Sequence, residues 1–413
     1  MPNDKTQELI IESLGSRGDG IVQGPEGPVY VPFTLPGERV CTTVKGERGE
    51  LLEVLEESSE RCAPICRHFG TCGGCSLQHL QSEPYLEWKR EQVRQAFTAR
   101  GFEIEIEPVI PAQASTRRRS VLAARRTRSS VLLGYLRRSS HEIVDAEECP
   151  ILRERIVGVL PHLREMLGPL LSRKGQARLT ILDTANGLDI AIEGVREIAG
   201  PDLLMQMSQW TDELDLARLT VNGEILATRR PPALMFSGVE VVPEPAAFVQ
   251  ATQEAEDVLV RHILDACKGA LRVADLFSGS GTFTLPLARQ SEVLAVEVEQ
   301  GALDAIGTAV RNAQGLKPVK TLSRDLFREP MSPDELAEFD AVIFDPPRAG
   351  ASAQAMQLAQ STVNKIVAVS CNPATLARDV RILVDGGYQV LKVQPVDQFL
   401  YSAHVEVVAV MVR

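Results

Sequence analysis

The feature that most constrains the fold is a regular alternation of strands and helices in the last third of the chain. Apolar runs that favour strands are separated by helical segments, and they lie at residues 271–277, 292–297, 318–322, 340–344 and 365–370. Strands that are apolar along their whole length, with helices between them, predict a parallel sheet covered on both faces. Two more strands, at 388–396 and 404–412, close the chain. We therefore expect an α/β fold with a doubly wound sheet.

Polar side chains follow these strands at the sheet edge where open α/β folds bind ligands. The loop DLFSGSGTF comes after the first strand, and Gly279 and Gly281 allow it to turn tightly and approach a ligand. Glu297 ends the second strand, where a carboxylate can accept both ribose hydroxyls, and Asp325 after the third strand is placed to face an adenine. The loop has no lysine, which argues against a nucleotide phosphate. S-adenosylmethionine fits this pattern better.

A cysteine and two carboxylates converge on the same edge. Cys371 directly follows the strand at 365–370, and Asp345 begins the stretch DPPRAG, whose two prolines hold the backbone still. Glu406 interrupts the apolar run HVEVVAVMV, where a carboxylate is costly unless it lines a site. Together with a methyl donor, these groups predict nucleophilic catalysis on uracil. A thiolate that adds to C6 makes C5 nucleophilic, and a base then removes the C5 proton.

The combination of FVQAT, DLFSGSGTF, DPPRAG, SCNP and HVE resembles the RNA uracil-5 methyltransferase family. CRHFGTCGGCSLQHL and the front of the chain resemble its TRAM-domain, iron–sulfur 23S rRNA branch. The resemblance implies a class I (Rossmann-like) S-adenosylmethionine methyltransferase unit, with Cys371 as nucleophile, Glu406 as the base and Asp345 near the target base. This sequence departs from the family pattern at Thr282 and Thr252, two positions where family members frequently have asparagine. The predicted cofactor-binding residues are Gln250, Phe277, Gly279, Gly281, Thr282, Glu297, Asp325 and Asp345.

The chain divides into three predicted units. Residues 1–58 contain short strands with glycine and proline turns, which predicts an OB-like β-barrel of the TRAM kind, a common platform for RNA. Residues 59–245 form a mixed α+β central domain, in which a helix at about 83–105 is placed to pack on the catalytic domain. Residues 246–413 form the methyltransferase domain.

The charge distribution favours RNA as the partner. The net charge of −11 argues weakly against nucleic acid, but residues 108–141 contain eight arginines and no carboxylate. A solvated charged hairpin is the alternative explanation for this run. The predicted RNA-binding residues are Arg117, Arg118, Arg119, Arg125, Arg126 and Arg128.

Four cysteines crowd into the pattern C-x3-C-x5-C-x2-C, from Cys62 to Cys75, which predicts a metal site. The spacing alone allows zinc with four thiolate ligands. The family resemblance instead implies a 4Fe-4S cluster held by Cys66, Cys72, Cys75 and the distant Cys149, which leaves Cys62 spare. Because the reaction has no redox step, such a cluster would be structural or would position RNA. Cys41 and Cys267 are interpreted as packing residues.

The leading hypothesis is S-adenosylmethionine-dependent methylation of uracil C5 in 23S rRNA, giving 5-methyluridine. The T-loop uridine of tRNA is an alternative substrate. A radical methylthiotransferase would need C-x3-C-x2-C, and a non-catalytic iron–sulfur RNA-binding sensor would need neither Cys371 nor Glu406. The polar stretch at residues 1–8 lacks the apolar core of a signal peptide, and no apolar run has the length of a membrane span. We therefore expect a cytoplasmic monomer.

Overall fold

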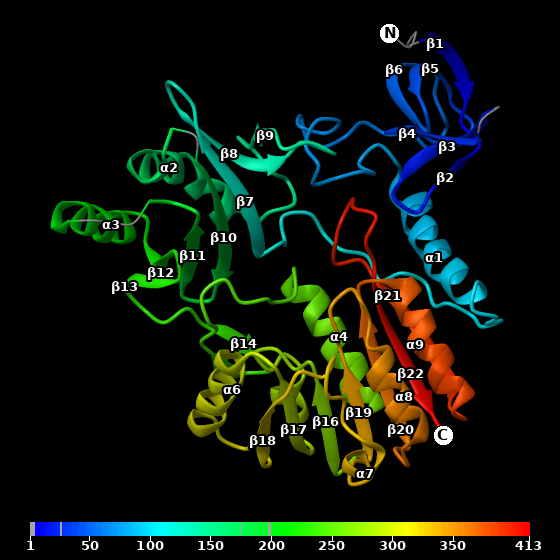
Figure 1. Cartoon of the computed structure of the whole chain (residues 1–413), viewed down its shortest axis with the longest axis vertical. Coiled ribbons are helices and arrows are strands. Elements are labelled where there is room, and N and C mark those ends of the chain that lie inside the picture. Colours follow the sequence, from blue (N-terminus) through cyan, green and yellow to red (C-terminus); the bar gives the residue numbers. More distant parts are fainter. Residues whose placement is uncertain (1–4, 25–26, 174, 197–199) are drawn as a thin grey trace.

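The computed structural model describes residues 5–24, 27–173, 175–196 and 200–413. Residues 1–4 of the predicted barrel lie outside this range. The described chain forms an N-terminal β unit, a central mixed sheet and a C-terminal α/β unit, which occupy the upper right, the upper left and the bottom of Figure 1. No helix in the described ranges combines the length and apolar character that crossing a bilayer requires.

The N-terminal unit is one sheet with the strand order β1-β5-β6-β4-β3-β2. Alternate residues of its strands point inward and form a small core of Ile11, Val22, Val29, Val31 and Val40. Its strands are β1 (Lys5–Ile10), β2 (Ser13–Leu14), β3 (Asp19–Gly24), β4 (Gly27–Pro32), β5 (Arg39–Lys45) and β6 (Arg48–Glu56).

The central unit is a sheet with the order β13-β12-β11-β10-β7-β8-β9. Its apolar residues pack with helices α2 (Glu154–Leu170) and α3 (Pro201–Glu213) into a separate core. The strands are β7 (Arg119–Arg126), β8 (Val131–Leu136), β9 (Ile143–Asp145), β10 (Gln176–Thr184), β11 (Gly187–Glu193), β12 (Leu216–Val221) and β13 (Glu224–Thr228). A short hairpin, β14 (Leu234–Phe236) and β15 (Val239–Val241), then leads toward the C-terminal unit.

The C-terminal unit confirms the predicted doubly wound sheet, whose strand order is β18-β17-β16-β19-β20-β22-β21. Strands β16 to β20 pair in parallel, whereas β22 runs antiparallel to both of its neighbours. The strands are β16 (Arg272–Leu276), β17 (Glu292–Glu297), β18 (Val319–Ser323), β19 (Ala341–Phe344), β20 (Lys365–Ser370), β21 (Gln389–Val396) and β22 (Glu406–Val412). The strand order reverses between β16 and β19, which is the kind of position where open α/β sheets bind ligands.

Helices cover both faces of this sheet and complete two apolar cores. They are α4 (Gln253–Ala266), α5 (Thr284–Leu287), α6 (Gln300–Asn312), α7 (Pro333–Leu336), α8 (Ser352–Gln360) and α9 (Pro373–Asp385). Helix α1 (Ser82–Thr98) joins them from earlier in the chain, since its Val93 and Phe97 are buried in the same core as α9. The helix packs on the C-terminal unit and ends at Thr98, short of the predicted end near residue 105. A turn with Gly101 at φ 76° follows it.

Candidate active site

The loop after β16 has the backbone shape that its glycines predict. Phe277, Gly279 and Gly281 all have positive φ, at 61°, 51° and 92°. At Gly281 a Cβ atom would lie 2.9 Å from Cγ1 of Ile306, so a larger residue would collide with α6. Thr282 lies half-buried in the same turn. The loop therefore passes close to α6 and presents its backbone at the carboxyl edge of the sheet.

The predicted cofactor residues come together around this loop. The carboxylate of Glu297 accepts hydrogen bonds from the backbone N–H of Gly279 at 3.0 Å and from Val298 at 2.7 Å. Asp325 accepts a backbone hydrogen bond from Phe327 at 3.0 Å, and the rings of Phe277 and Phe327 lie 5.3 Å apart. Phe327 is 48% exposed and was not predicted. These contacts place two carboxylates and two aromatic rings at the carboxyl edge of the sheet.

A third carboxylate, Asp275, lies beneath the loop and was missed as a functional residue. Its pKa is raised to about 7, mainly by burial, and the negative charges of Asp345 and Glu297 contribute to this shift. One of its oxygens accepts a hydrogen bond from Thr284 at 2.6 Å, whereas Oδ1 has no partner among the described residues. The three neighbouring carboxyl groups, Asp275, Asp345 and Glu297, repel anions and favour a cationic ligand. This agrees with a ligand that carries a sulfonium and disagrees with a nucleotide phosphate.

This carboxyl group makes a testable contribution to stability. Its pKa in the folded chain exceeds its ordinary value of 3.8, so the folded state binds more protons than the unfolded state between the two values. Stability therefore falls as the pH rises from about 4 through 7. Asp275→Asn should stabilise the protein by up to about 4 kcal/mol at pH 8 and by less than half as much at pH 5.

Thermal unfolding of wild type and Asp275→Asn at both pH values measures this difference. Asp257→Asn is the matched control, because that carboxylate is exposed on α4. An Asp275→Asn gain that is the same at pH 5 and pH 8 would contradict the assignment of a raised pKa.

Cys371 lies where the sequence predicts, between β20 and α9. Asn372 caps α9 by accepting a hydrogen bond from the backbone N–H of Ala374 at 3.1 Å. Burial raises the pKa of the Cys371 thiol to about 11, the charges of Glu406 and Asp345 act in the same direction, and the Arg348 guanidinium opposes them. The thiol therefore shares its electrostatic environment with both predicted carboxylates and with one arginine that favours the thiolate.

A chain of hydrogen bonds links the two carboxylates. Gln250 donates to Oδ2 of Asp345 at 3.3 Å and accepts from Nε2 of Gln398 at 2.8 Å. The same Nε2 donates to Oε2 of Glu406 at 2.5 Å, while Oε1 of Gln398 accepts from the backbone N–H of Ala251 at 3.1 Å. Gln398 was not predicted. Its signal in the sequence is a polar residue only eight positions before the embedded Glu406.

Burial sets the proton affinity of these carboxyls. It raises the pKa of Glu406 well above its ordinary value, and the charge of Asp345 adds to the effect. Burial also raises the pKa of Asp345 to about 7, against the hydrogen bond from Gln250. Two buried, linked carboxyls with raised pKa values beside a thiol form a site suited to proton removal and nucleophilic attack.

Comparison with known proteins identifies this arrangement. A family profile described as tRNA (Uracil-5-)-methyltransferase matches residues 243–413. A 23S rRNA (uracil(1939)-C(5))-methyltransferase of Vibrio vulnificus is 31% identical, over 99% of this chain and 96% of its own length. This chain belongs to the RNA uracil-5 methyltransferase family. It is accordingly an enzyme that uses S-adenosylmethionine, and this result rejects the non-catalytic sensor.

Two further proteins are also similar to this methyltransferase along almost its whole length. An uncharacterized RNA methyltransferase of Brucella suis is 47% identical over 100% of this chain and 99% of the relative. The crystal structure of a Pyrococcus abyssi tRNA (uracil-54, C5)-methyltransferase with S-adenosyl-L-homocysteine superposes with a TM-score of 0.78. It is 25% identical and covers 98% of this chain and 99% of its own. The similarity therefore includes the units that precede the methyltransferase sheet.

The predicted RNA-binding arginines of this methyltransferase fall into three groups by exposure. The prediction for Arg118 is wrong, because its side chain is buried and forms a 2.5 Å ion pair with Glu256 of α4. Arg117 and Arg119 are half-buried, and Arg119 donates to the backbone oxygen of Ala247 at 3.0 Å. The arginines that are exposed at the end of β7 and in the turn to β8 are Arg125, Arg126 and Arg128.

The cysteines of the cluster segment, residues 61–81, are free thiols. Burial raises the pKa of Cys75 to about 12, and the charges of Cys149, Cys72 and Cys66 raise it as well. Cys62 is not part of this set, and its thiol donates to the backbone oxygen of Gln78 at 3.5 Å. Within the described residues, no three or more His, Cys, Asp or Glu side chains are grouped so that they could hold a metal ion. The 4Fe-4S cluster of the family resemblance therefore stays a prediction.

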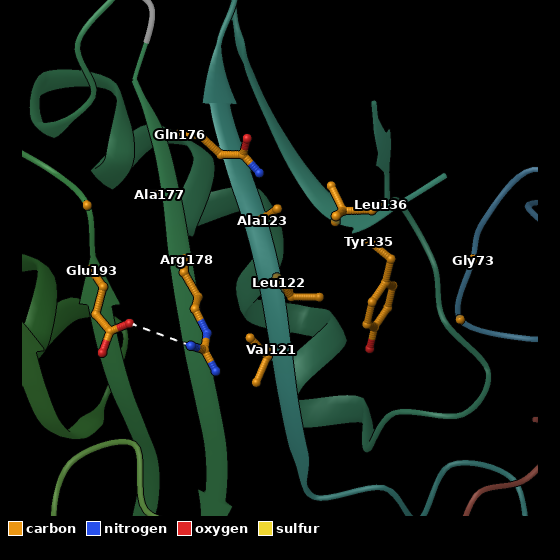
Figure 2. Close-up of a pocket in the computed structure, with 13 residues that line it drawn as sticks. Gly73, Val121, Leu122, Ala123, Tyr135, Leu136, Gln176, Ala177, Arg178 and Glu193 are labelled. Carbon is orange, nitrogen blue, oxygen red and sulfur yellow. Dashed lines mark ion pairs between the residues drawn. The ribbon is translucent and has the colours of Figure 1, made fainter. Parts of the chain in front are cut away.

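A cavity of about 620 Å³ separates the cluster segment from the open face of the central sheet. Val121 and Ala123 of β7, Tyr135 of β8 and Arg178 of β10 line it on one side, and Gly73 lines it on the other (Figure 2). The hydroxyl of Tyr135 lies 2.6 Å from that of Ser120. The cavity therefore lies between the cluster segment and the sheet that carries the exposed arginines.

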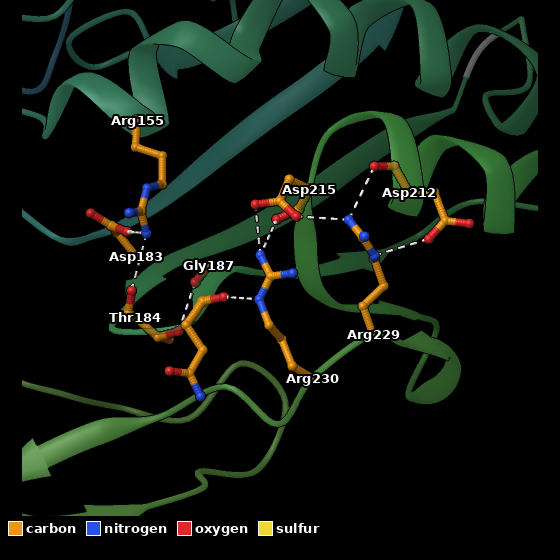
Figure 3. Close-up of polar contacts among 9 residues, drawn as sticks. Arg155, Asp183, Thr184, Gly187, Asp212, Asp215, Arg229 and Arg230 are labelled. Carbon is orange, nitrogen blue, oxygen red and sulfur yellow. Dashed lines mark hydrogen bonds and ion pairs between the residues drawn. The ribbon is translucent and has the colours of Figure 1, made fainter.

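A second cavity, of about 650 Å³, lies on the outer side of the central unit. Its arginines are already paired, since Arg155 contacts Asp183 at 2.8 Å and Arg230 contacts Asp215 at 2.7 Å (Figure 3). These ion pairs tie α2 to β10, and the segment after β13 to the loop between α3 and β12. We interpret the cavity as part of the packing of the central unit.

Proposed function

We propose that this enzyme methylates C5 of a uridine in 23S rRNA, giving 5-methyluridine, through a covalent bond between Cys371 and C6. The observation that carries this proposal is the hydrogen-bond chain from Asp345 through Gln250 and Gln398 to Glu406, beside Cys371. The choice of 23S rRNA is supported by the Vibrio vulnificus relative, which bears that name and aligns along almost the whole chain.

The reaction begins when the target base leaves its stack and reaches Cys371. Cys371 first loses its proton to solvent. As the thiolate Sγ bonds to C6, the C5=C6 electron pair moves toward C5, and C5 attacks the methyl carbon supplied by the bound donor. The carbon–sulfur bond of the donor breaks, and its electron pair stays on that sulfur. Glu406 then takes the C5 proton, the C–H pair restores C5=C6, and Cys371 leaves as thiolate. The raised pKa of Glu406 makes its carboxylate a stronger base for this step.

The residues at the carboxyl edge of the sheet fit the methyl donor. In this proposal Glu297 binds the ribose, Asp325 faces the adenine beside the ring of Phe277, and Gln250 and Asp345 lie at the reacting end. Gly279, Gly281 and Thr282 contribute the loop that approaches the donor. The three carboxylates around this loop suit a ligand with a positive sulfonium. Thr252, in contrast, caps α4 by accepting a hydrogen bond from Ala255 at 3.1 Å.

The RNA contacts are proposed for the N-terminal β unit, as a TRAM-type barrel, and for the exposed Arg125, Arg126 and Arg128. Their exposure and the absence of carboxylates in residues 108–141 support this assignment. We further propose functional units at residues 1–58, 59–245 and 246–413, although α1 of the second unit packs on the third. The enzyme would act as a cytoplasmic monomer.

A tRNA uridine is the second candidate, because the Pyrococcus abyssi structure is that of a tRNA methyltransferase. Mapping 5-methyluridine in 23S rRNA and tRNA, from cells with and without this protein, separates the two. Loss from 23S rRNA alone is expected, and loss from tRNA alone would favour the second candidate. A second experiment measures the affinity for RNA at increasing salt concentration. Contacts to phosphate predict that this affinity falls as the salt concentration rises, and an affinity that does not change would contradict such contacts.

The proposed cluster is a 4Fe-4S group held by Cys66, Cys72, Cys75 and Cys149, which would brace the cluster segment against the central unit. The mutual influence of these four thiols supports the set. Cys62→Ser and Cys149→Ser form a matched pair of variants. Anaerobically purified wild type and Cys62→Ser should be brown and contain about four iron atoms per chain, whereas Cys149→Ser should lose them. Colourless protein containing zinc, or iron lost from Cys62→Ser alone, would contradict this set.

A further inference from the structure

The loop between β21 and β22, residues 397–405, connects the active site to a distant part of the chain. Gln398 in this loop holds Glu406, as described above. Its neighbour Asp397 is fully buried on the other side, against helix α1. In Figure 1 the loop rises from the sheet toward the two N-terminal units. Two adjacent residues of the loop therefore contact the proposed base and helix α1: Gln398 contacts Glu406, and Asp397 contacts Lys89.

Lys89 of α1 donates three hydrogen bonds, and all three are accepted by residues of this loop. Its ammonium group is completely buried and donates to Oδ1 of Asp397 at 2.6 Å. It also donates to the backbone oxygens of His404 at 2.6 Å and Phe399 at 3.2 Å. An ammonium group has three protons to donate. All of them are used to fix the start, the middle and the end of one loop.

Two further anchors hold the middle of the loop. The hydroxyl of Tyr85 donates to Oδ2 of Asp397 at 2.8 Å and accepts from the backbone N–H of Tyr401 at 2.8 Å. The backbone N–H groups of Ser76 and Leu77, in the cluster segment, donate to the backbone oxygen of Tyr401 at 2.8 and 3.1 Å. The loop is thus held by α1 and by the segment next to Cys75.

An ion pair at this position is a costly way to stabilise a fold. Lys89 and Asp397 are both completely buried, and desolvation of such a pair offsets most of its attraction. Val93 and Phe97, the next buried positions along α1, are apolar and would be matched by an apolar residue at position 89. The pair instead restricts the loop to one conformation, in which Gln398 contacts Glu406.

We propose that Lys89 is a positioning residue for the removal of the C5 proton. Acting through Asp397 and Gln398, it holds the carboxylate of Glu406 where the proton must be taken. This inference rests on the proposed function and adds a residue outside the methyltransferase sheet to its machinery. The effect should fall mainly on proton removal, because the loop contacts Glu406 directly through Gln398 but reaches Cys371 only indirectly, through His404, whose ring nitrogen lies 3.1 Å from the Arg348 guanidinium.

The test uses the full-length double variant K89M/D397N, which removes the pair without leaving an unpaired buried charge. With an RNA substrate and S-adenosylmethionine, the rate of covalent adduct formation should stay within about threefold of wild type. Breakdown of the adduct should slow at least tenfold, since a general base contributes roughly 10²–10⁴ in rate. Denaturing gels of RNA-linked protein measure both rates. Y85F, which removes one anchor, should slow breakdown by a smaller factor.

R218M/D189N is the matched control, because Arg218 and Asp189 form a buried 2.7 Å pair within the central sheet. It should retain the wild-type partition between adduct formation and breakdown. Breakdown at the wild-type rate in both K89M/D397N and Y85F would overturn the inference. If K89M/D397N fails to fold, Y85F decides alone, by its breakdown rate and by faster hydrogen exchange at Tyr401. Absence of any adduct in wild type would instead overturn the proposed function.

Discussion

Cys371→Ala is expected to abolish methyl transfer, by a factor of at least about 10⁴, while RNA binding and folding persist. The reason is chemical. C5 of uracil is a weak nucleophile until a thiolate adds to C6, and no other described cysteine shares the environment of Asp345 and Glu406. The side chain is only half-buried, so its truncation leaves no large cavity. Transfer of radiolabelled methyl groups to RNA measures the loss, and thermal unfolding checks the fold.

Cys267→Ala is the matched control for this variant. Cys267 is completely buried at the end of α4 among apolar residues, so its loss should lower stability and leave the turnover number unchanged. Full activity of Cys371→Ala would rule out covalent catalysis by this thiol. Equal inactivation of both variants would show that the effect is structural.

The ends of the strands in the C-terminal sheet were predictable because their signals are local. A run of β-branched residues ends at a polar residue, and parallel strands bring such ends to one edge. Glu297, Asp345 and Cys371 follow directly from this rule. Glu406 was predictable because a carboxylate within an apolar strand needs a polar environment.

The contacts across the chain were not predictable, because they depend on pairing between residues far apart. Arg118 meets Glu256, which lies 138 positions later, and Lys89 meets Asp397, 308 positions later. The consecutive arginines 117–119 have the composition of a basic patch. However, in extended backbone successive side chains point to opposite sides, so the middle arginine turns away from its neighbours. That alternation could have indicated that Arg118 is buried.

Glu406→Gln is expected to stop the reaction after methyl transfer and to trap RNA on the protein. Cys371 and the methyl donor are untouched, so the adduct forms and C5 is methylated. Without a base, the C5 proton is removed about 10²–10⁴ times more slowly. Glutamine has the same shape and can still accept the hydrogen bond from Gln398, so the chain to Gln250 and Asp345 is retained. Mass spectrometry of the RNA-linked peptide should find the extra methyl group.

The same experiment on Asp345→Asn decides which linked carboxyl is the base. Asp345 and Glu406 are joined through Gln250 and Gln398, so geometry alone permits either to receive the proton. Burial and the charge of Asp345 raise the pKa of Glu406 well above its ordinary value, and the family resemblance assigns Glu406 the role of the base. Asp345→Asn should therefore trap no methylated adduct, because Glu406 is retained as the base. A trapped, methylated adduct in Asp345→Asn, with normal turnover of Glu406→Gln, would reverse the two roles.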